Sequence, residues 1–439
     1  MQRALAIACV LTAIGLTATA SADKRPRPDY DGRGNVEAHD ESPALWIPRV
    51  VLFPFYVVNE YAFRRPLGAL ITRAERDRWV DAVTNLFTFG PSNNYLIIPT
   101  ALVDFGLLPS VGIYFAGDDM FHPHNSVRLY GATGGLHWLT ASALDRYNWN
   151  NYRTSVSGRF ELTRRPDLLF YGIGPDVRDD RRSRYALQRI EGSTSFHQGF
   201  FGESFLSVGG GIRAMAYRGD VCCSEPSISQ RIADGTIERP PGYGTDYTLA
   251  FGRAALMLDT RDPRPAPGTG AYLQLHGELD SDVKNDRNWM HYGGIAGVAI
   301  DLNGRQRTMR LQAGADFADP TGNRIIPFSE LSTLGSDAMP GFIAGWMTGP
   351  STTFAQLGYT WPVWMYLDGQ IRVSTGNAFG PHLEDFALKK LRMSYDVGLT
   401  SVGARDSAFE ILFGLGTETF EQGGSITSVR FTFGSRRGF

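Results

Sequence analysis

Residues 271–279 read Ala-Tyr-Leu-Gln-Leu-His-Gly-Glu-Leu, and the alternation within this stretch decides the fold that the sequence predicts. Its odd-numbered positions are small or apolar, and its even-numbered positions are polar. The same period of two recurs in three further segments: 308–317, 365–373 and 427–433. Successive side chains of a β-strand point to opposite faces, so each segment indicates a strand with one apolar and one polar face. Charged residues recur on the polar face in mid-strand, among them Arg310, Asp316, Asp368 and Arg372.

Similar patterning from Asn94 onward gives sixteen candidate strands: 95–105, 109–118, 125–133, 135–147, 150–164, 182–197, 200–218, 245–260, 269–282, 289–302, 306–318, 351–362, 365–377, 390–402, 407–418 and 424–433. Most exceed the roughly nine to eleven residues that a tilted strand needs to cross a bilayer. A sheet can lie in lipid only when it closes on itself, because an open edge leaves backbone groups unsatisfied. We therefore predict an all-β fold, a transmembrane antiparallel β-barrel of about 16 strands.

The lengths of the connections agree with this prediction. The three longest, 165–181, 219–244 and 319–350, follow the fifth, seventh and eleventh candidate strands. If both ends of the barrel sequence face the periplasm, all three connections lie at the extracellular end, where long loops are typical of such barrels.

Composition excludes several other classes of protein. The 439 residues carry 43 Lys and Arg against 45 Asp and Glu, so there is no positive excess for binding nucleic acid. A mean hydropathy of −0.19 is too low for a bundle of membrane helices. The 50 glycines exceed the usual share and suit barrel walls and turns.

The N-terminal part divides into two segments before the barrel at 94–439. Residues 1–22 combine a positive start, an apolar run and a final Ala-Ser-Ala, which predicts a secretory signal peptide. Residues 23–93 form a periplasmic segment that begins with a polar, flexible stretch. Apolar residues at helical spacing between Leu67 and Leu86 predict one amphipathic helix of about five turns, with Pro66 in its first turn.

The mature chain would contain two cysteines, Cys222 and Cys223, within a polar connection. Neighbouring cysteines cannot form an ordinary disulfide between strands. The sequence is compatible with two states of this pair, a vicinal disulfide or two free thiols.

Three motifs resemble those of the BamA/TamA superfamily of outer-membrane barrels, also called surface antigens. The first is Asp259-Thr260-Arg261-Asp262-Pro263 with the later Pro-Gly pair that contains Gly268. The second is Met339-Pro340-Gly341-Phe342 in the 319–350 connection, and the third is the strand at 427–433 with Phe439 at the chain terminus. The resemblance covers about 94–439, and it implies a barrel of sixteen strands. When the resemblance is set aside, the residues of the first motif predict a rigid periplasmic turn with no further role.

The sequence departs from this superfamily in two places. In the superfamily the long loop enters the lumen, and an Arg before Gly-Phe pairs with an Asp on a late strand. Here Pro340 occupies the Arg position, and Asp396, two residues before Gly398, is the candidate partner. Members also carry soluble periplasmic (POTRA) modules before the barrel, for which residues 23–93 leave too little chain.

The last strand is expected to carry the signal read by the barrel-insertion machinery. Counting back from Phe433 places Phe431, Val429 and Thr427 toward lipid. We therefore expect the strand to end at Phe433, with residues 434–439 as a periplasmic tail.

Two functions follow for a protein of the Gram-negative outer membrane. The resemblance implies a barrel that assists insertion or export of proteins, or passage of lipid, through a weak seam between its first and last strands. The alternative is a passive or gated pore constricted by the 319–350 loop. Expected partners are outer-membrane lipid, lipopolysaccharide and the insertion machinery, with the client unidentified. No enzymatic activity, metal, cofactor or nucleic-acid partner is predicted.

Overall fold

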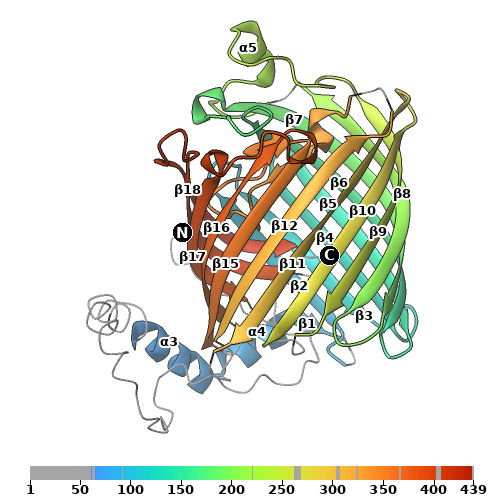
Figure 1. Cartoon of the computed structure of the whole chain (residues 1–439). Coiled ribbons are helices and arrows are strands. Elements are labelled where there is room, and N and C mark those ends of the chain that lie inside the picture. Colours follow the sequence, from blue (N-terminus) through green and yellow to red (C-terminus); the bar gives the residue numbers. More distant parts are fainter. Residues whose placement is uncertain are drawn as a thin grey trace.

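A closed antiparallel barrel of 16 strands forms the body of the protein (Figure 1). The computed structural model describes residues 61, 65–90, 92–219, 221–261, 268–302, 307–322, 325–364, 367–401 and 407–437. The barrel strands are β2 (Tyr95–Asp104), β3 (Ser110–Asp118), β4 (Asn125–Gly135), β5 (Trp138–Trp149), β6 (Thr154–Phe170), β7 (Ser183–Gly199), β8 (Phe205–Arg218), β9 (Tyr247–Asp259), β10 (Gly270–Asp282), β11 (Arg287–Asp301), β12 (Thr308–Pro320), β15 (Ser351–Trp364), β16 (Leu367–Phe379), β17 (Arg392–Ser401), β18 (Ser407–Thr417) and β19 (Ile426–Arg437).

Each barrel strand pairs with its neighbours in the chain, and β19 pairs with β2 to close the ring. The predicted fold and the sixteen predicted strand positions are confirmed, with ends that shift by a few residues. The largest shift at a loop is in β6, which was expected to end at residue 164 and continues to Phe170.

The predicted end of the last strand was wrong. β19 does not stop at Phe433 but continues to Arg437, where it still pairs with β18. Gly434 lies between these points with a φ of +139°, and a Cβ there would collide with the carbonyl oxygen of Ala101. The strand thus continues through a glycine in a conformation that other residues rarely adopt, which a count of alternating residues does not reveal. Phe439 lies outside the described residues.

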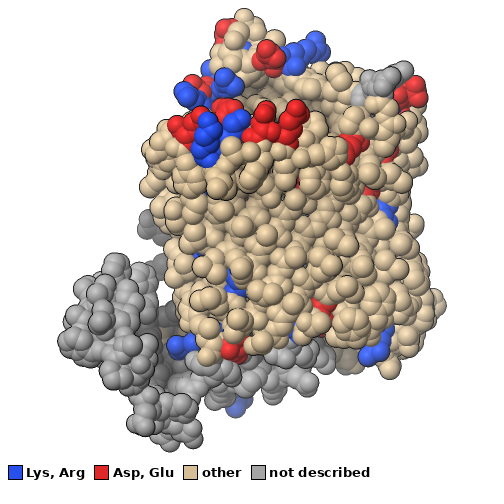
Figure 2. Space-filling view, viewed as in Figure 1, with Lys and Arg blue, Asp and Glu red and all other residues tan. Residues whose placement is uncertain are grey.

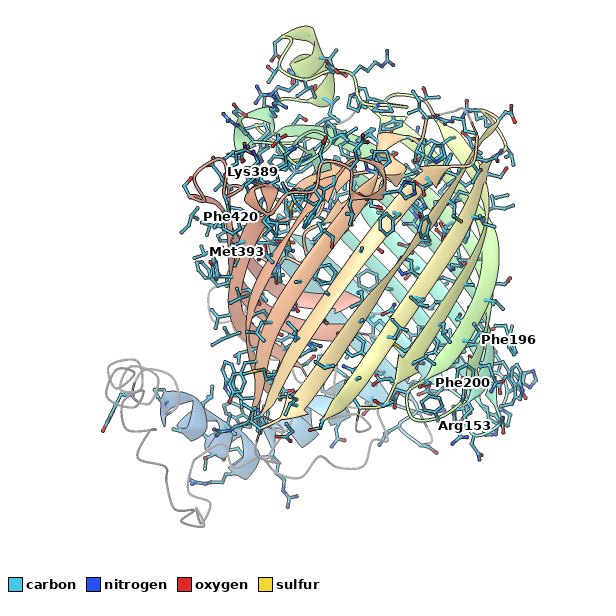
Figure 3. All side chains as sticks on the ribbon, viewed as in Figure 1. Arg153, Phe196, Phe200, Lys389, Met393 and Phe420 are labelled. Atoms are coloured by element: carbon cyan, nitrogen blue, oxygen red, sulfur yellow. A yellow bond between two sulfur atoms is a disulfide. The ribbon has the colours of Figure 1, made fainter. Side chains whose placement is uncertain are left out.

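The alternation seen in the sequence separates the two faces of the wall. On β10, Leu275 and Leu279 face outward with 44% and 60% exposure, whereas Asp280 and Asp282 face inward and are buried. In the space-filling view the wall is largely uncharged, and charged residues gather at the end that carries α5 (Ile228–Ala233) (Figure 2). Phe196 and Phe200 lie near one end of the barrel and Phe420 near the other (Figure 3). An apolar band between aromatic residues is typical of a transmembrane barrel.

In the described residues before the barrel, 65–89, the predicted single helix is instead two helices. α3 (Arg65–Arg76) and α4 (Trp79–Phe87) are separated at Arg78, whose φ of +50° is incompatible with a continuous helix. The short strand β1 (Thr88–Phe89) then pairs with β2. α4 lies under one end of the barrel, here called the α4 end, and the opposite end is called the α5 end (Figure 1).

No helix in the described part of the chain is both long and apolar enough to span a membrane.

The connection between β12 and β15 folds into the lumen, and its residues 325–350 are called the inward loop. It contains the 3-10 turn η4 (Phe328–Glu330) and the hairpin of β13 (Ser332–Leu334) and β14 (Met347–Gly349). Its apolar side chains form a buried core with Phe354 and Ala378 of the wall. The remaining 3-10 turns are η3 (Asp179–Arg181), η5 (Pro381–Leu383) and η6 (Leu388–Lys390).

A charge placed on the outer face should be costly only in mid-wall. Leu357 lies halfway along β15 and is 47% exposed, while Leu302 lies in the turn after β11 and is 54% exposed. We expect Leu357→Arg to lower the free energy of unfolding by about 2–4 kcal/mol and Leu302→Arg by no more than about 1 kcal/mol. Urea unfolding of the barrel in lipid vesicles measures both values. Equal costs would contradict a bilayer-spanning wall.

Candidate functional site

The seam between the last and first strands is the shortest pairing in the ring among the described residues. Only Thr432 with Asp104, Phe433 with Val103, and Gly434 with Leu102 lie opposite one another. By contrast, β18 pairs with β19 over nearly its whole length. One further backbone hydrogen bond, from Phe105 N to Phe431 O at 3.0 Å, extends the seam at the α5 end.

A buried ion pair joins the two sides of the seam on the luminal face. Arg430 on β19 donates from Nε and Nη2 to the two carboxylate oxygens of Asp104 on β2, at 2.7 and 2.6 Å. Arg430 is 2% exposed and Asp104 is 8% exposed. A bidentate contact of this kind fixes the relative orientation of the two side chains as well as pairing their charges. The pair thereby ties strands that few backbone hydrogen bonds hold together.

The same arginine also holds the inward loop. Its Nη1 donates to the carbonyl oxygens of Pro340 and Phe342, at 3.3 and 3.2 Å. Between them, Gly341 donates from N to Ser394 Oγ at 2.8 Å and accepts from Ser428 Oγ at 2.7 Å. The loop motif is therefore bound through its backbone by polar side chains of β17 and β19.

Glycines allow this close approach. A Cβ at Gly341 would lie 2.8 Å from the backbone nitrogen of Gly416 and would collide with the carbonyl of Leu415. On the wall, a Cβ at Gly414 would lie 2.8 Å from the Pro340 oxygen, and one at Gly416 would enter the Phe342 ring. The predicted site residues Gly341 and Phe342 thus lie flat against a glycine-lined part of β18, where Phe342 is fully buried.

Asp396 does not contact the inward loop in the described hydrogen bonds and ion pairs. Its Oδ1 accepts from Arg372 Nε on the neighbouring strand at 2.8 Å. The loop is held instead by Arg430, which reaches the carbonyls of Pro340 and Phe342 from the wall. Gly398 lies on the same strand as Asp396, where a Cβ would collide with the Ile411 carbonyl.

The lower half of the seam, toward the α4 end, is closed by side chains. There β1 pairs with β2 at Thr88–Leu96 and Phe89–Tyr95, while β3 occupies the other edge of β2. Leu96, Ile98 and Phe409 form a buried apolar cluster, against which Phe87 of α4 packs. The predicted residue Phe433 joins it with an edge-to-face contact to Phe409, at 5.4 Å between ring centres. Residues 97–101 of β2 have no seam-side strand partner in the described part of the chain.

The predicted turn at Asp259 lies far along the wall from the seam, at the α4 end of β9. Asp259 is buried and accepts from Arg261 N at 3.0 Å and from Arg261 Nη2 at 2.5 Å. The Arg261 guanidinium lies over the Tyr272 ring, 4.2 Å from its centre. Thr260 exchanges hydrogen bonds with Ala271. These contacts join the end of β9 to the start of β10, shortly after Gly268; Asp262 lies outside the described residues.

A second group of polar contacts anchors the other part of the inward loop. Glu330 accepts from Tyr247 OH at 2.6 Å, and its other carboxylate oxygen lies 3.5 Å from Arg213 on β8. Arg213 also contacts Glu191 at 2.8 Å and Glu278 at 2.9 Å. The inward loop is therefore fixed both at the seam and at the strands around β8 to β11.

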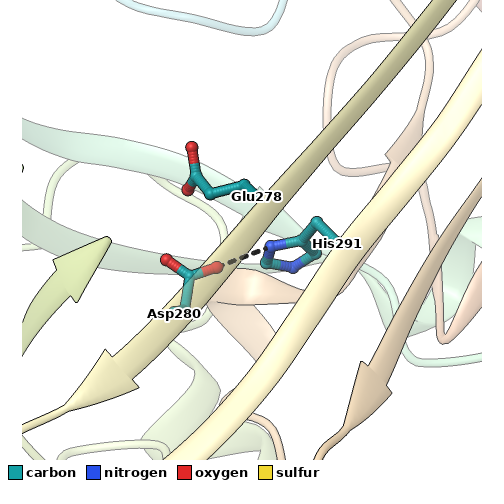
Figure 4. A group of neighbouring side chains, drawn as sticks. All are labelled: Glu278, Asp280 and His291. Carbon is teal, nitrogen blue, oxygen red and sulfur yellow. Dashed lines mark hydrogen bonds and ion pairs between the residues drawn. The ribbon is translucent and has the colours of Figure 1, made fainter. Parts of the chain in front are cut away.

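Three of the residues around this second anchor have the spacing of a metal site. Glu278, Asp280 and His291 offer ligand atoms within 4.8 Å of one another (Figure 4). However, the Arg213 guanidinium already faces both carboxylates, at 2.9 and 3.9 Å. The ring nitrogens of His291 contact Asp280 and the Glu330 carbonyl. We interpret the group as an ion-pair network that holds the loop.

Sequence reasoning did not single out Arg430 or Asp104. The available signal was a charged residue at an inward position on each of the first and last predicted strands. Pairing across the ring between residues so distant in the chain depends on strand register, which the alternation does not specify.

Comparisons with known proteins support the fold. No known sequence family matches the chain, and no curated protein matches it. Among solved structures, the barrel is similar to the crystal structure of BamA from Haemophilus ducreyi lacking POTRA domains 1–3, with a TM-score of 0.56 and 13% identity over 78% of this chain and 70% of that chain. It also matches CdiB from Acinetobacter baumannii, with a TM-score of 0.49 and 9% identity over 78% of this chain and 59% of that chain. The resemblance to BamA/TamA barrels is thus confirmed at the level of the fold.

Removing one partner of the seam ion pair should destabilise the barrel strongly. Arg430→Met leaves the buried Asp104 carboxylate unpaired, so we expect the free energy of unfolding to fall by about 3–5 kcal/mol. Adding Asp104→Leu to that variant should recover most of the loss. The matched control is Arg372→Met with Asp396→Leu, a luminal pair that does not cross the seam. A loss from Arg430→Met below about 1 kcal/mol would contradict the assigned role.

The close contact at Gly341 gives a second test. Gly341→Ala forces a methyl group into the backbone of β18, so we expect a loss of about 1–3 kcal/mol in the free energy of unfolding and faster proteolysis of the inward loop. Gly322→Ala is the control, because a Cβ there meets no atom within 4 Å. Equal behaviour of the two variants would show that the loop does not rest on this strand.

Proposed function

We propose that the protein is an outer-membrane barrel that assists the insertion or translocation of other proteins through its β2–β19 seam. The observation that carries this proposal is the incomplete pairing of the seam, whose strands face each other at three residue pairs. The fold shared with BamA and the predicted signal peptide support the same location and class of function. On this proposal the barrel is not an enzyme.

The chemistry of the seam explains how such a barrel would act. On the seam side, residues 97–101 of β2 present backbone C=O groups and N–H groups, except that Pro99 has no N–H. Unsatisfied groups of this kind cost several kcal/mol in lipid. An exposed strand edge is therefore a template for a further strand. A client protein that pairs a strand with this edge would gain backbone hydrogen bonds at the depth where it must enter the membrane.

The N-terminal segment occupies part of this edge. β1 pairs with Tyr95 and Leu96, and Phe87 packs in the adjoining apolar cluster. We infer that a client strand displaces β1 or begins beyond it. Lipid, lipopolysaccharide and the insertion machinery remain the proposed partners, and the client is unidentified.

The inward loop argues against the alternative of an open pore. Its residues Met339 and Phe342 are fully buried against the luminal wall, and Arg430 holds its backbone. A planar bilayer containing the protein should therefore show closed or flickering behaviour. A large and steady conductance would favour the pore instead.

Locking the seam should abolish the proposed activity. Vesicles containing the protein should accelerate the folding of a small, urea-unfolded outer-membrane barrel several-fold relative to empty vesicles. Oxidised Val103→Cys/Phe433→Cys, which joins opposed residues across the seam, should remove that acceleration, and reduction should restore it.

The matched control is Val298→Cys/Leu311→Cys, an opposed pair between β11 and β12 that lies away from the seam. Its oxidation should leave the acceleration unchanged. An accelerated rate that persists with the seam fully cross-linked, or no acceleration by the unmodified protein, would refute the proposed function.

A further inference from the structure

A cavity of about 850 Å³ lies at the α5 end of the barrel, separate from the seam. The ends of β7 and β8 form one side of it through Tyr185, Tyr217 and Arg218, and residues 221–244 form the rest. Its size falls within the range of pockets that bind small organic molecules. The inward loop packs against its tyrosines through Phe328 but does not line it.

The walls of this cavity are fixed by contacts to the barrel. Arg184 on β7 donates from its backbone N to Pro226 O at 2.9 Å and from Nε to Glu225 at 2.7 Å. α5 begins with a reciprocal cap between Ser227 and Gln230, and its Ile228 is fully buried. A disulfide joins Cys222 to Cys223 in the same wall, which settles the alternative left open by the sequence. The pocket is thus pre-formed, which reduces the entropy lost on binding.

The lining combines aromatic rings with hydroxyl and amide groups. The rings of Tyr217 and Tyr243 lie 5.5 Å apart in an edge-to-face arrangement. The Tyr243 hydroxyl is 2.9 Å from Ser229 Oγ, and Gln230 lines the same space. Tyrosine offers an apolar face beside a hydrogen-bonding group, which suits a ring that carries both C–H and O–H groups. A sugar ring carries both kinds of group.

The lining contains two arginines, Arg218 and Arg239, and one carboxylate, that of Glu225, which arginines behind the lining neutralise. Arg182 and Arg184 already engage Glu225 at 3.0 and 2.7 Å, and the hydrogen bond from Arg184 holds the pKa of that carboxyl at about 2. Arg218 and Arg239 also line the pocket, and neither forms an ion pair with a described residue. Arg218 donates to Gln188, and Arg239 donates to the Tyr243 carbonyl at 3.0 Å. Two exposed guanidinium groups thus remain for an anion.

We propose that this pocket binds a sugar carrying an acidic group, a carboxylate or a phosphate, with the sugar ring against the tyrosines and the acidic group at Arg218 and Arg239. The site goes beyond the proposed insertion function and does not depend on it. Acidic sugars occur both in lipopolysaccharide and in free polysaccharides, and the two sources share this chemistry.

Calorimetric titration of the full chain in detergent micelles tests the proposal with three probes: digalacturonate, glucose 1-phosphate and the neutral disaccharide galactobiose. We expect at least one acidic probe to bind at least tenfold more tightly than galactobiose, because a charge-assisted contact adds to the stacking. Arg239→Gln and Arg218→Gln should each weaken that binding about tenfold. Competition by purified lipopolysaccharide would assign the ligand to the membrane, and lack of competition would assign it to a free saccharide.

The matched control is Arg178→Gln, an exposed arginine at the same end that does not line the pocket. The affinity of the Arg178→Gln variant for the acidic probe should stay within twofold of that of the unmodified protein. Tyr243→Ala should weaken the binding of both acidic and neutral sugars. The proposal is overturned if neither acidic probe binds more tightly than galactobiose, or if Arg178→Gln weakens binding as much as Arg239→Gln.

Discussion

The Arg430–Asp104 ion pair is the interaction on which the other features of the barrel depend. It connects the last strand to the first where backbone pairing is short, and it holds the inward loop through the carbonyls of Pro340 and Phe342. A buried charge pair is costly to assemble and costly to break. One guanidinium group therefore contributes both to the closure of the ring and to the position of the loop at the seam, which couples the two.

The remaining architecture separates a strong wall from this weak seam. Elsewhere in the ring the strands pair over long stretches, and apolar residues such as Leu275 face outward. Inside, a second anchor at Glu330 and Arg213 holds the loop on the opposite side of the lumen. At the α4 end the seam is closed by β1 and by the apolar cluster around Ile98. Among the described residues, these contacts leave residues 97–101 of β2 without a strand partner on the seam side.

The sequence predicted the wall well because a period of two is a local property. It reproduced all sixteen strands, yet it missed the continuation of β19 through Gly434 and the break at Arg78, since each depends on a single backbone conformation. Gly341 and Phe342 were selected through their motif. Asp396, the candidate partner for the Arg position that Pro340 occupies, contacts Arg372. The arginine that holds the loop lies 90 residues beyond Pro340 in the chain. Only the three-dimensional register brings Arg430, Asp104 and the loop together, so no local pattern could have paired them.

Backbone hydrogen exchange at the seam tests the central claim most directly. In lipid nanodiscs, the amides of residues 102–105 and 431–434 should exchange much faster than those in the paired centres of β10 and β11, because local opening follows the weakest pairing. Asp104→Asn should accelerate exchange further at the seam and in residues 339–343 of the inward loop, and leave β10 and β11 unchanged. Seam amides as slow as those of the wall, or a uniform response to Asp104→Asn, would contradict a seam held by this ion pair.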